Sequence, residues 1–318
     1  MDIKNSRIAI TGGSGFLGTN LYLALLACGV PKENITAAGS QSHNLLSPEA
    51  CGQLCEGRDI VFHLAGYVGG IGRHTQEPAR VVHDNIIMNA NVIDAAAAKG
   101  VGKLVLVGTA CSYPEDAPVP LKEEDLWKGY PAKDTAPYGL VKRMMTVQAN
   151  AYREQYGLSA ITLIPTNIYG KHDHFESEAA HVIPALISRI AKAKAIRSRQ
   201  VQVWGDGTAT REFIYAEDVA AALIKAAERY DKPEPVNIGT GEEATIKSLA
   251  VLIANLIGYS GWLVWDKSKP TGFRRRQMDI AKAEKEFGFR AGVPLREGLE
   301  KTIEWYNRKC EGGDYGNL

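Results

Sequence analysis

Short apolar segments alternate with amphipathic segments through the first half of the chain. Runs rich in β-branched residues predict strands at residues 7–11, 34–38, 59–65, 103–108 and 160–165. The runs 59–65 and 103–108 are apolar almost throughout, which is typical of strands buried on both faces of a parallel sheet. Helical periodicity predicts helices at 16–28, 81–99 and 138–156, the last two ended by Gly100 and Gly157. The alternation predicts an α/β fold with a Rossmann-type, doubly wound parallel sheet.

The pattern changes after residue 166. Loops lengthen, glycine, histidine and charged residues become more frequent, and short strands such as 201–204 appear. We expect a smaller, discontinuous α/β substrate domain formed by about 167–212 and 240–318. A dinucleotide-binding domain would comprise 1–166 and about 213–239, with segments 211–219 and 235–239 rejoining the main sheet.

Composition narrows the classes of partner. A formal net charge of +1 argues against a nucleic-acid partner, and no apolar run reaches the ~18 residues that a bilayer span needs. Five cysteines, without a C-x-x-C pair or an evident targeting segment, favour free thiols in a reducing compartment. The expectation is therefore a cytoplasmic protein that binds neither membrane nor nucleic acid.

A glycine-rich turn follows the first predicted strand. Gly12, Gly13, Gly15 and Gly18 satisfy both G-x-G-x-x-G and T-G-x-x-G-x-x-G. The early glycines allow a tight turn and close approach to a pyrophosphate, and Gly18 allows the helix to pack on the strand. The N–H groups at the start of the helix then face the anion. This placement predicts a dinucleotide site.

The nature of the dinucleotide depends on the segment after the second strand. An enzyme that uses NAD usually carries a carboxylate there, for the ribose hydroxyls. Residues 37–43 contain no carboxylate, which favours NADP(H). The arginine expected beside a 2′-phosphate is also missing, so NAD(H) stays open.

Tyr138 and Lys142 form a Y-x-x-x-K pattern at the start of a predicted helix. Positions i and i+4 share one helix face, so the ammonium can stabilise the phenolate. Many such pairs are only surface pairs. Here, however, Thr109 follows the strand 103–108, and ligands of open α/β sheets bind at the carboxyl ends of strands. Thr109 and Tyr138 can then share a substrate carbonyl oxygen, as in short-chain dehydrogenases.

More specific motifs recur in order along nearly the whole chain. They are 68–71 (VGGI), Cys111, 113–114 (YP), 165–173 (PTNIYGKHD), 181–186 (HVIPAL), 203–208 (VWGDGT), 211–213 (REF), 237–241 (NIGTG) and 268–272 (SKPTG). With them the chain resembles the GDP-L-fucose synthase family, which are GDP-4-keto-6-deoxy-D-mannose 3,5-epimerase/4-reductases of the extended short-chain dehydrogenase/reductase superfamily. The family commonly has serine where this chain has Thr109.

The resemblance implies catalytic roles for Thr109, Cys111, Tyr138, Lys142 and His181. Cys111 would be the base and His181 the acid of epimerisation, on opposite faces of the sugar, since thiol and imidazole both exchange protons near neutrality. Thr109 and Tyr138 would stabilise the enolate oxygen, and Tyr138 would protonate it when carbon 4 is reduced.

The resemblance also implies binding residues. Contacts to NADP(H) are expected from Gly12, Gly13, Ser14, Gly15, Phe16, Leu17, Gly18, Ser40, Leu64, Ala65, Gly66, Tyr138, Lys142, Pro165, Asn167, Ile168 and His181. Contacts to a nucleotide-diphosphate sugar are expected from Cys111, Asn167, Val182, Leu186, Arg189, Trp204, Arg211 and Lys269. One of residues 274–276 could add a ligand, because three consecutive arginines cannot all point one way. No metal ligand is expected.

Other interpretations remain at this stage. Cys111 and His181 could serve packing and capping alone. The enzyme could be a reductase or epimerase of a related 4-keto nucleotide sugar, for example a GDP-heptose, or an NAD-dependent nucleotide-sugar 4-epimerase. A dinucleotide sensor without catalysis would tend to lack the Y-x-x-x-K pair. Helices 81–99 and 138–156 carry enough apolar residues for a two-fold contact, so we expect a homodimer, although these faces could simply cover the sheet.

Overall fold

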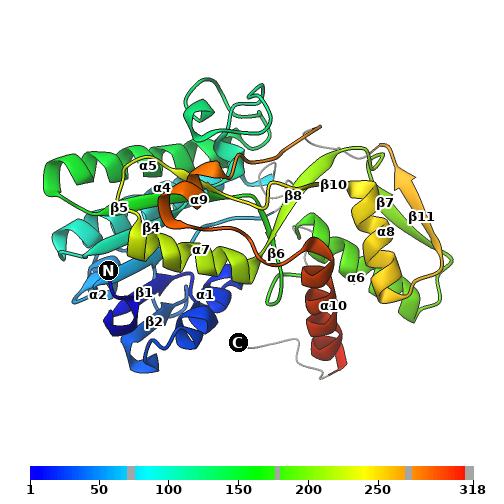
Figure 1. The fold of residues 1–318 in the computed structure, drawn as a ribbon, viewed down its shortest axis with the longest axis horizontal. Helices are drawn as coiled ribbons and strands as arrows, with labels where there is room; N and C mark the ends of the chain where they lie inside the picture. The colour runs from blue at the N-terminus through cyan, green and yellow to red at the C-terminus, as the bar shows by residue number, and fades with distance from the viewer. Residues whose placement is uncertain (70–75, 176–179, 269–273, 312–318) are drawn as a thin grey trace.

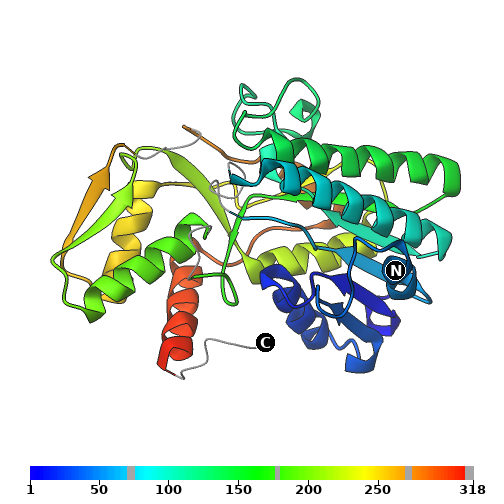
Figure 2. The same ribbon diagram turned by 180° about the vertical axis from the view of Figure 1, so that it is seen from behind.

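A computed structural model describes residues 1–69, 76–175, 180–268 and 274–311 (Figures 1 and 2). The strands are β1 (Ile8–Thr11), β2 (Ile35–Ala38), β3 (Ile60–His63), β4 (Lys103–Val107), β5 (Ala160–Pro165), β6 (Asn167–Tyr169), β7 (Gln200–Trp204), β8 (Thr210–Tyr215), β9 (Val236–Ile238), β10 (Glu243–Thr245) and β11 (Trp262–Asp266). The helices are α1 (Phe16–Ala27), α2 (Pro48–Cys55), α4 (Pro78–Ala98), α5 (Ala136–Tyr156), α6 (Val182–Ala195), α7 (Ala216–Arg229), α8 (Ile246–Ile257), α9 (Ala281–Phe287) and α10 (Leu295–Glu311). Short 3-10 turns include η3 (Ala110–Ser112) and η4 (Glu123–Asp125).

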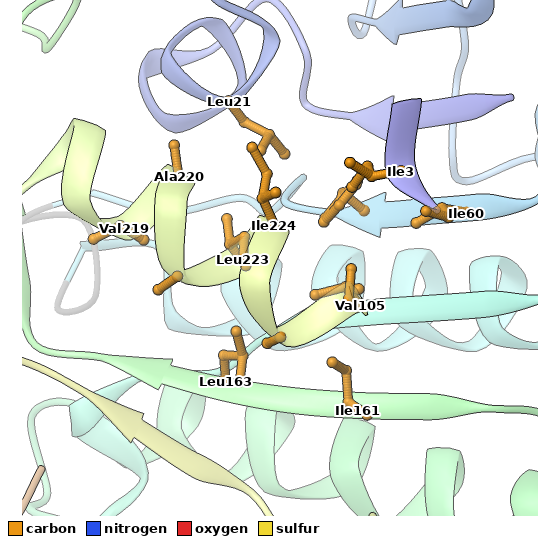
Figure 3. Packing of buried hydrophobic residues seen from close by; sticks show 14 of the residues in the cluster. Ile3, Leu21, Ile60, Val105, Ile161, Leu163, Val219, Ala220, Leu223 and Ile224 are labelled. Carbon is orange, nitrogen blue, oxygen red and sulfur yellow. The ribbon is translucent and has the colours of Figure 1, made fainter. Parts of the chain in front are cut away.

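Six parallel strands form the main sheet in the order β2-β1-β3-β4-β5-β9. Alternate residues of each strand enter different cores: Ile8 and Ile10 pack toward α1 and α7, whereas Ala9 packs toward α2 and α4. Figure 3 shows the first core, where Leu223 of α7 and Leu21 of α1 lie over the sheet. Burial on both faces explains the continuous apolar runs. The predicted α/β class and doubly wound sheet are confirmed.

A smaller unit lies beside the main sheet, as Figure 1 shows. It contains the three-stranded sheet β10-β8-β6, the two-stranded sheet β11-β7 and helices α6, α8 and α10, which share one apolar core. The expectation that segment 211–219 rejoins the main sheet is wrong, because β8 pairs with β6 and β10, and α7 begins at Ala216. Phe213 and Tyr215 face the smaller core while Ile214 faces the larger one, so this strand is also buried on both sides. The expected return at 235–239 is confirmed by β9.

Helix α9 departs from the expected division of the chain. It was expected within the substrate domain, but it packs on α7 and β9, and Ala283, Phe287 and Phe289 enter the larger core (Figure 1). The domain limits themselves remain a proposal, drawn at 1–166 plus about 213–239 and about 167–212 plus 240–318, with α9 covering the larger unit.

The order of strands creates a crevice. The chain moves from β1 to one neighbour, β2, and later to the other, β3, so the connections after β1 and β3 diverge at the carboxyl edge of the sheet. Ligands of open α/β sheets bind at this switch point. No helix in the described segments is long and apolar enough to cross a membrane.

Candidate active site

The glycine loop is shaped by close backbone approaches at the switch point. Gly12 has φ of +67°, and a Cβ there would lie 2.9 Å from the Ala65 nitrogen, in the loop that follows β3. A Cβ on Gly13 would lie 2.6 Å from the Ala37 Cα, and one on Gly18 would lie 2.1 Å from the Gly12 oxygen. These three positions therefore admit only glycine in this geometry. Helix α1 begins after Gly15, whose cap position offers no side-chain acceptor.

A buried hydrogen-bond network lies beneath the loop. The Thr11 hydroxyl lies 2.8 Å from His63 Nδ1 and accepts the N–H groups of Leu64 and Ala65, each at 3.1 Å. His63 Nε2 lies 3.0 Å from Asn89 Oδ1 on α4. Burial, reinforced by the charge of Lys142, lowers the pKa of His63 to about 3, so the imidazole is neutral and is a structural tie rather than an acid.

Tyr138 and Lys142 occupy one face of α5, as predicted. The Lys142 Nζ lies 5.9 Å from the centre of the Tyr138 ring. Within the described residues, the buried Lys142 ammonium has the Met145 sulfur, 3.9 Å away, as its hydrogen-bond acceptor, and this burial lowers its pKa to about 8. Burial also raises the pKa of Tyr138, and a charge on Cys111 raises it further. The phenol is therefore a proton donor at neutral pH.

Cys111 is brought beside Tyr138 by close packing of η3 on α5. A Cβ on Gly139 would lie 2.3 Å from the Cys111 carbonyl oxygen, so the turn rests directly on the helix backbone. The Ser112 hydroxyl donates to the Gly139 carbonyl at 3.0 Å. Thr109 caps η3, its hydroxyl oxygen accepting the Cys111 N–H at 3.2 Å while its proton stays available to another acceptor.

One arginine contacts the Cys111 side chain, and the charge of Cys111 also acts on a second. Arg276 Nη1 donates to Cys111 Sγ across 3.6 Å. Burial lowers the pKa of Arg211 to about 10, with Arg276 lowering it further and Cys111 raising it. The surroundings of Cys111 are therefore drawn from α5, β8 and the segment before α9.

Two fully buried polar residues hold these elements together. Glu212 accepts the N–H groups of Thr240, Gly241 and Met278 at 2.6, 2.9 and 2.6 Å. Asn237 accepts the Tyr113 hydroxyl at 2.7 Å and donates to the Leu121 carbonyl at 2.9 Å. Glu212 of the recurring motif 211–213 and Asn237 of the motif 237–241 thus act as internal ties, a role that the sequence did not predict for these two residues.

The residues expected to bind substrate gather partly on the smaller unit. Arg189 of α6 lies 5.1 Å from the centre of the Trp204 ring of β7, so these two are brought together. Val182 begins α6, and Leu186 is buried in the smaller core. Asn167 Nδ2 donates to the Glu212 carbonyl at 2.8 Å. Lys269, Gly70 and Ile71, together with Thr271 and Gly272, lie outside the described residues.

His181 lies at the start of α6, on the smaller unit. It caps α6 without a side-chain hydrogen bond, and within the described segments no hydrogen bond joins it to Cys111. Its side chain is accessible to solvent, yet the protein around the ring lowers its pKa by desolvation, with nearby His174 lowering it further. All five cysteines are free thiols, as expected.

The chain is similar to known proteins along most of its length. Residues 8–239 match the NAD dependent epimerase/dehydratase family. A probable GDP-L-fucose synthase 1 of Oryza sativa subsp. japonica is 37% identical over 305 residues, covering 95% of this chain and 92% of the relative. The chain belongs to the GDP-L-fucose synthase family. The resemblance drawn from the sequence motifs is confirmed, and the chain is an NAD(P)-dependent enzyme.

Solved structures of this family share the fold. A GDP-6-OMe-4-keto-L-xylo-heptose reductase from Campylobacter jejuni has a TM-score of 0.90 and 29% identity, covering 97% of this chain and 99% of its own. A GDP-L-fucose synthetase from Naegleria fowleri, bound to NADP, has a TM-score of 0.87 and 26% identity, covering 97% and 96%. The structural neighbours of this chain therefore include a GDP-L-fucose synthetase and a heptose reductase.

The dinucleotide fits the residues present. Among the described residues, no oxygen accepts a hydrogen bond from the buried Lys142 ammonium, and ribose hydroxyls would supply one. The glycine contacts leave the start of α1 open for a pyrophosphate. Ser40 is exposed after β2, whereas Leu64, Ala65 and Gly66 follow β3 at the other side of the crevice. Pro165 ends β5, and Ile168 lies in β6.

Proposed function

We propose that this enzyme converts GDP-4-keto-6-deoxy-D-mannose to GDP-L-fucose by epimerising carbons 3 and 5 and reducing carbon 4. The observation that carries this proposal is the packing of η3 on α5, which holds Cys111 beside Tyr138. A reductase needs only the tyrosine at the ketone oxygen. A thiol held beside it by Gly139 and Thr109 adds a base at the neighbouring carbons.

NADP(H) is the proposed dinucleotide, held by residues 12–18, 64–66, Ser40, Lys142 and residues 165–168, with His181 also near it. The missing carboxylate after β2 and the NADP-bound relative from Naegleria fowleri support this choice over NAD(H). When bound, NADPH supplies the hydride that reduces carbon 4.

Epimerisation begins with a proton on a carbon beside the ketone. The Cys111 thiolate takes it, so a C–H bond breaks and an S–H bond forms, while the electron pair moves onto the ketone oxygen. The hydroxyls of Tyr138 and Thr109 donate to this enolate oxygen. His181 as imidazolium returns a proton to the opposite face. In this proposal the sugar ring lies between Cys111 and His181, so that base and acid act on opposite faces.

Reduction uses the same oxygen. Tyr138 donates its proton to the carbonyl oxygen as carbon 4 becomes tetrahedral, and the Lys142 ammonium stabilises the phenolate left behind. Burial keeps Tyr138 protonated until that step, because its pKa is raised. The arginines at 189 and 211 would hold the diphosphate, for which guanidinium groups are suited. Trp204 would lie against the nucleotide-sugar beside Arg189, and Lys269 would add a further cation.

A second candidate is reduction of a related 4-keto GDP-heptose. The TM-score of 0.90 to the Campylobacter jejuni heptose reductase favours it. An NAD-dependent 4-epimerase is the weaker alternative, because Cys111 has no part in that chemistry.

One experiment separates these functions. The enzyme is incubated with GDP-4-keto-6-deoxymannose in deuterated water, with and without NADPH. Deuterium at carbons 3 and 5 together with NADPH consumption is expected. Reduction without deuterium incorporation contradicts the epimerase function, and turnover of a 4-keto GDP-heptose alone would support the second candidate.

We also propose a homodimer in the cytoplasm. The outward faces of α4 and α5 expose Ile86, Met144 and Val147, and an apolar hollow lined by Pro78, Val82, Ile86 and Pro137 lies where the two helices begin. Exposed apolar residues grouped on adjacent helices favour a two-fold contact. The five free thiols support a reducing compartment.

A further inference from the structure

The segment 274–279 before α9 is held by backbone hydrogen bonds on both sides. The Arg274 and Arg276 carbonyls accept the N–H groups of Thr210 and Glu212 on β8, at 3.0 and 3.2 Å. On the other side, Gln277 and Asp279 exchange backbone hydrogen bonds with Leu121, each at 2.8 Å. These hydrogen bonds fix the direction of every side chain in the segment, because successive side chains of an extended backbone point to opposite faces.

The side chains of Arg275 and Arg276 consequently point in opposite directions. Arg275 points outward and forms an ion pair with Glu243, and its side chain is 53% exposed. Arg276 points inward, is 8% exposed, and donates to Cys111 Sγ at 3.6 Å. Glu212 secures this arrangement through the Met278 N–H, two residues further along.

The surroundings of the thiol favour negative charge. In the part of the chain that the structure describes, the titratable groups found against Cys111 are Tyr138 from α5, Arg211 from β8 and Arg276. Two are permanent cations, and the third is a protonated phenol. A cationic side chain next to a thiol stabilises the thiolate, which is the form that accepts protons.

We propose that Arg276 is a positioning residue that keeps Cys111 as a thiolate aimed at the proton to be removed. This rests on the proposed function, in which Cys111 is the epimerisation base. Arg276 acts through the sulfur, so it is distinct from arginines that bind the substrate diphosphate. The fixed segment supplies the cation before substrate arrives, and Arg211 reinforces it.

The test is the pH profile of Cys111 alkylation by iodoacetamide in the absence of nucleotide sugar, followed by peptide mass spectrometry. Cys28 is exposed and serves as an internal reference in the same molecule. In the unmodified enzyme the Cys111 midpoint is expected to lie below that of Cys28. A midpoint equal to or above that of Cys28 overturns the proposal, and this measurement needs no variant.

Variants then test whether Arg276 causes the reactivity of Cys111. Arg276→Gln is expected to slow Cys111 alkylation at pH 7 by about tenfold and move its profile toward alkaline pH, with Cys28 unchanged. Arg276→Lys is expected to restore the rate to within about threefold, because it keeps the charge. Arg275→Gln, the matched control, is expected to change neither cysteine. An unchanged Cys111 profile in a folded Arg276→Gln protein overturns the proposal, even if its KM for the nucleotide sugar rises.

The outcome is separable from that of the proposed function. Alkylation reports the thiolate without any sugar chemistry. A shifted profile with no deuterium incorporation into GDP-4-keto-6-deoxymannose would support the role of Arg276 while contradicting the epimerase. Deuterium incorporation with an unshifted alkylation profile would support the epimerase while contradicting the role of Arg276.

Discussion

Gly139 shows how one residue determines the distance between two reactive groups. It follows Tyr138 directly, and its missing side chain lets the Cys111 carbonyl approach within 2.3 Å of where a Cβ would stand. The Y-x-x-x-K pattern locates Tyr138 and Lys142 in the sequence, but it does not say what must lie against the residue after the tyrosine. That requirement comes from η3, which is adjacent only in space.

Replacing this glycine tests the contact. Gly139→Ala is expected to displace η3 and lower kcat by about tenfold or more, equivalent to ~1.4 kcal/mol of barrier, for both deuterium exchange and reduction. Gly52→Ala in α2 is the control, because its nearest atom would be 3.8 Å away. The control should keep full activity and melt at an equal or higher temperature, since alanine favours helix. Equal kinetics for both variants would argue against the contact.

His63 leads to an expectation about acid stability. Its folded pKa of about 3 lies below that of an unfolded histidine, so the unfolded chain binds one more proton as the pH falls from about 6.5. Stability contributed by neutral His63 is therefore complete above pH 7 and is lost as the pH falls. The slope approaches about 1.4 kcal/mol per pH unit between pH 6 and 5.

His63→Asn removes this titration while keeping a polar group near Thr11. The free energy of unfolding, measured by urea denaturation from pH 7 to 5, should then fall less steeply than in the unmodified protein. His83→Asn is the control, as the His83 side chain is 67% exposed. If the His63 variant retains the full slope, the buried-neutral assignment is wrong.

At the scale of elements, the strands of the main sheet were predictable because their residues are apolar on both faces. The helices α1, α4 and α5 were found within a few residues, and Gly100 and Gly157 end two of them with φ of +65° and +71°. Strand β8 was predicted in the wrong sheet, because it is apolar on both faces like the strands of the main sheet. Its two faces meet two different cores, and periodicity does not say which core a face will meet.

The buried Glu212 carboxylate on β8 accepts hydrogen bonds from three backbone N–H groups near the site. In Glu212→Gln an amide NH₂ replaces one of the two acceptor oxygens, and the amide oxygen that replaces the other is a weaker acceptor. The substitution is expected to lower the free energy of unfolding by roughly 1–3 kcal/mol. Glu243→Gln is the matched control, because Glu243 lies opposite Glu212 in β10 and pairs with the exposed Arg275. Exposed pairs contribute about 0–1 kcal/mol. Urea midpoints measure both, and equal losses would contradict the role of Glu212.

At the scale of the whole molecule, the two-unit arrangement brings together residues that no local pattern connects. Cys111 lies 165 positions from Arg276, and their contact depends on the segment before α9 running between β8 and the Leu121 loop. The sequence indicated that residues 274–276 could contribute a ligand, but only the fold shows which arginine points inward. The GDP-L-fucose synthase resemblance, in contrast, was recognisable from motifs spread along the chain.

The proposed dimer is also a property of the whole molecule. Met144→Lys places a charge on the exposed face of α5, where the side chain is 59% exposed, and should weaken association by about tenfold or more. Val251→Lys on α8, at 43% exposure, should leave the sedimentation coefficient unchanged. A dimer unaffected by Met144→Lys would place the interface elsewhere.

The most direct test of the central claim compares the enzyme with its Cys111→Ser variant in deuterated water. The account expects the variant to lose deuterium incorporation at carbons 3 and 5, because a serine hydroxyl is a far weaker base than a thiolate. It also expects the variant to reduce an already epimerised 4-keto sugar with NADPH, since Tyr138 and Lys142 are intact. Incorporation at the unmodified rate, or loss of both activities in a folded variant, would contradict a separate epimerase role for Cys111.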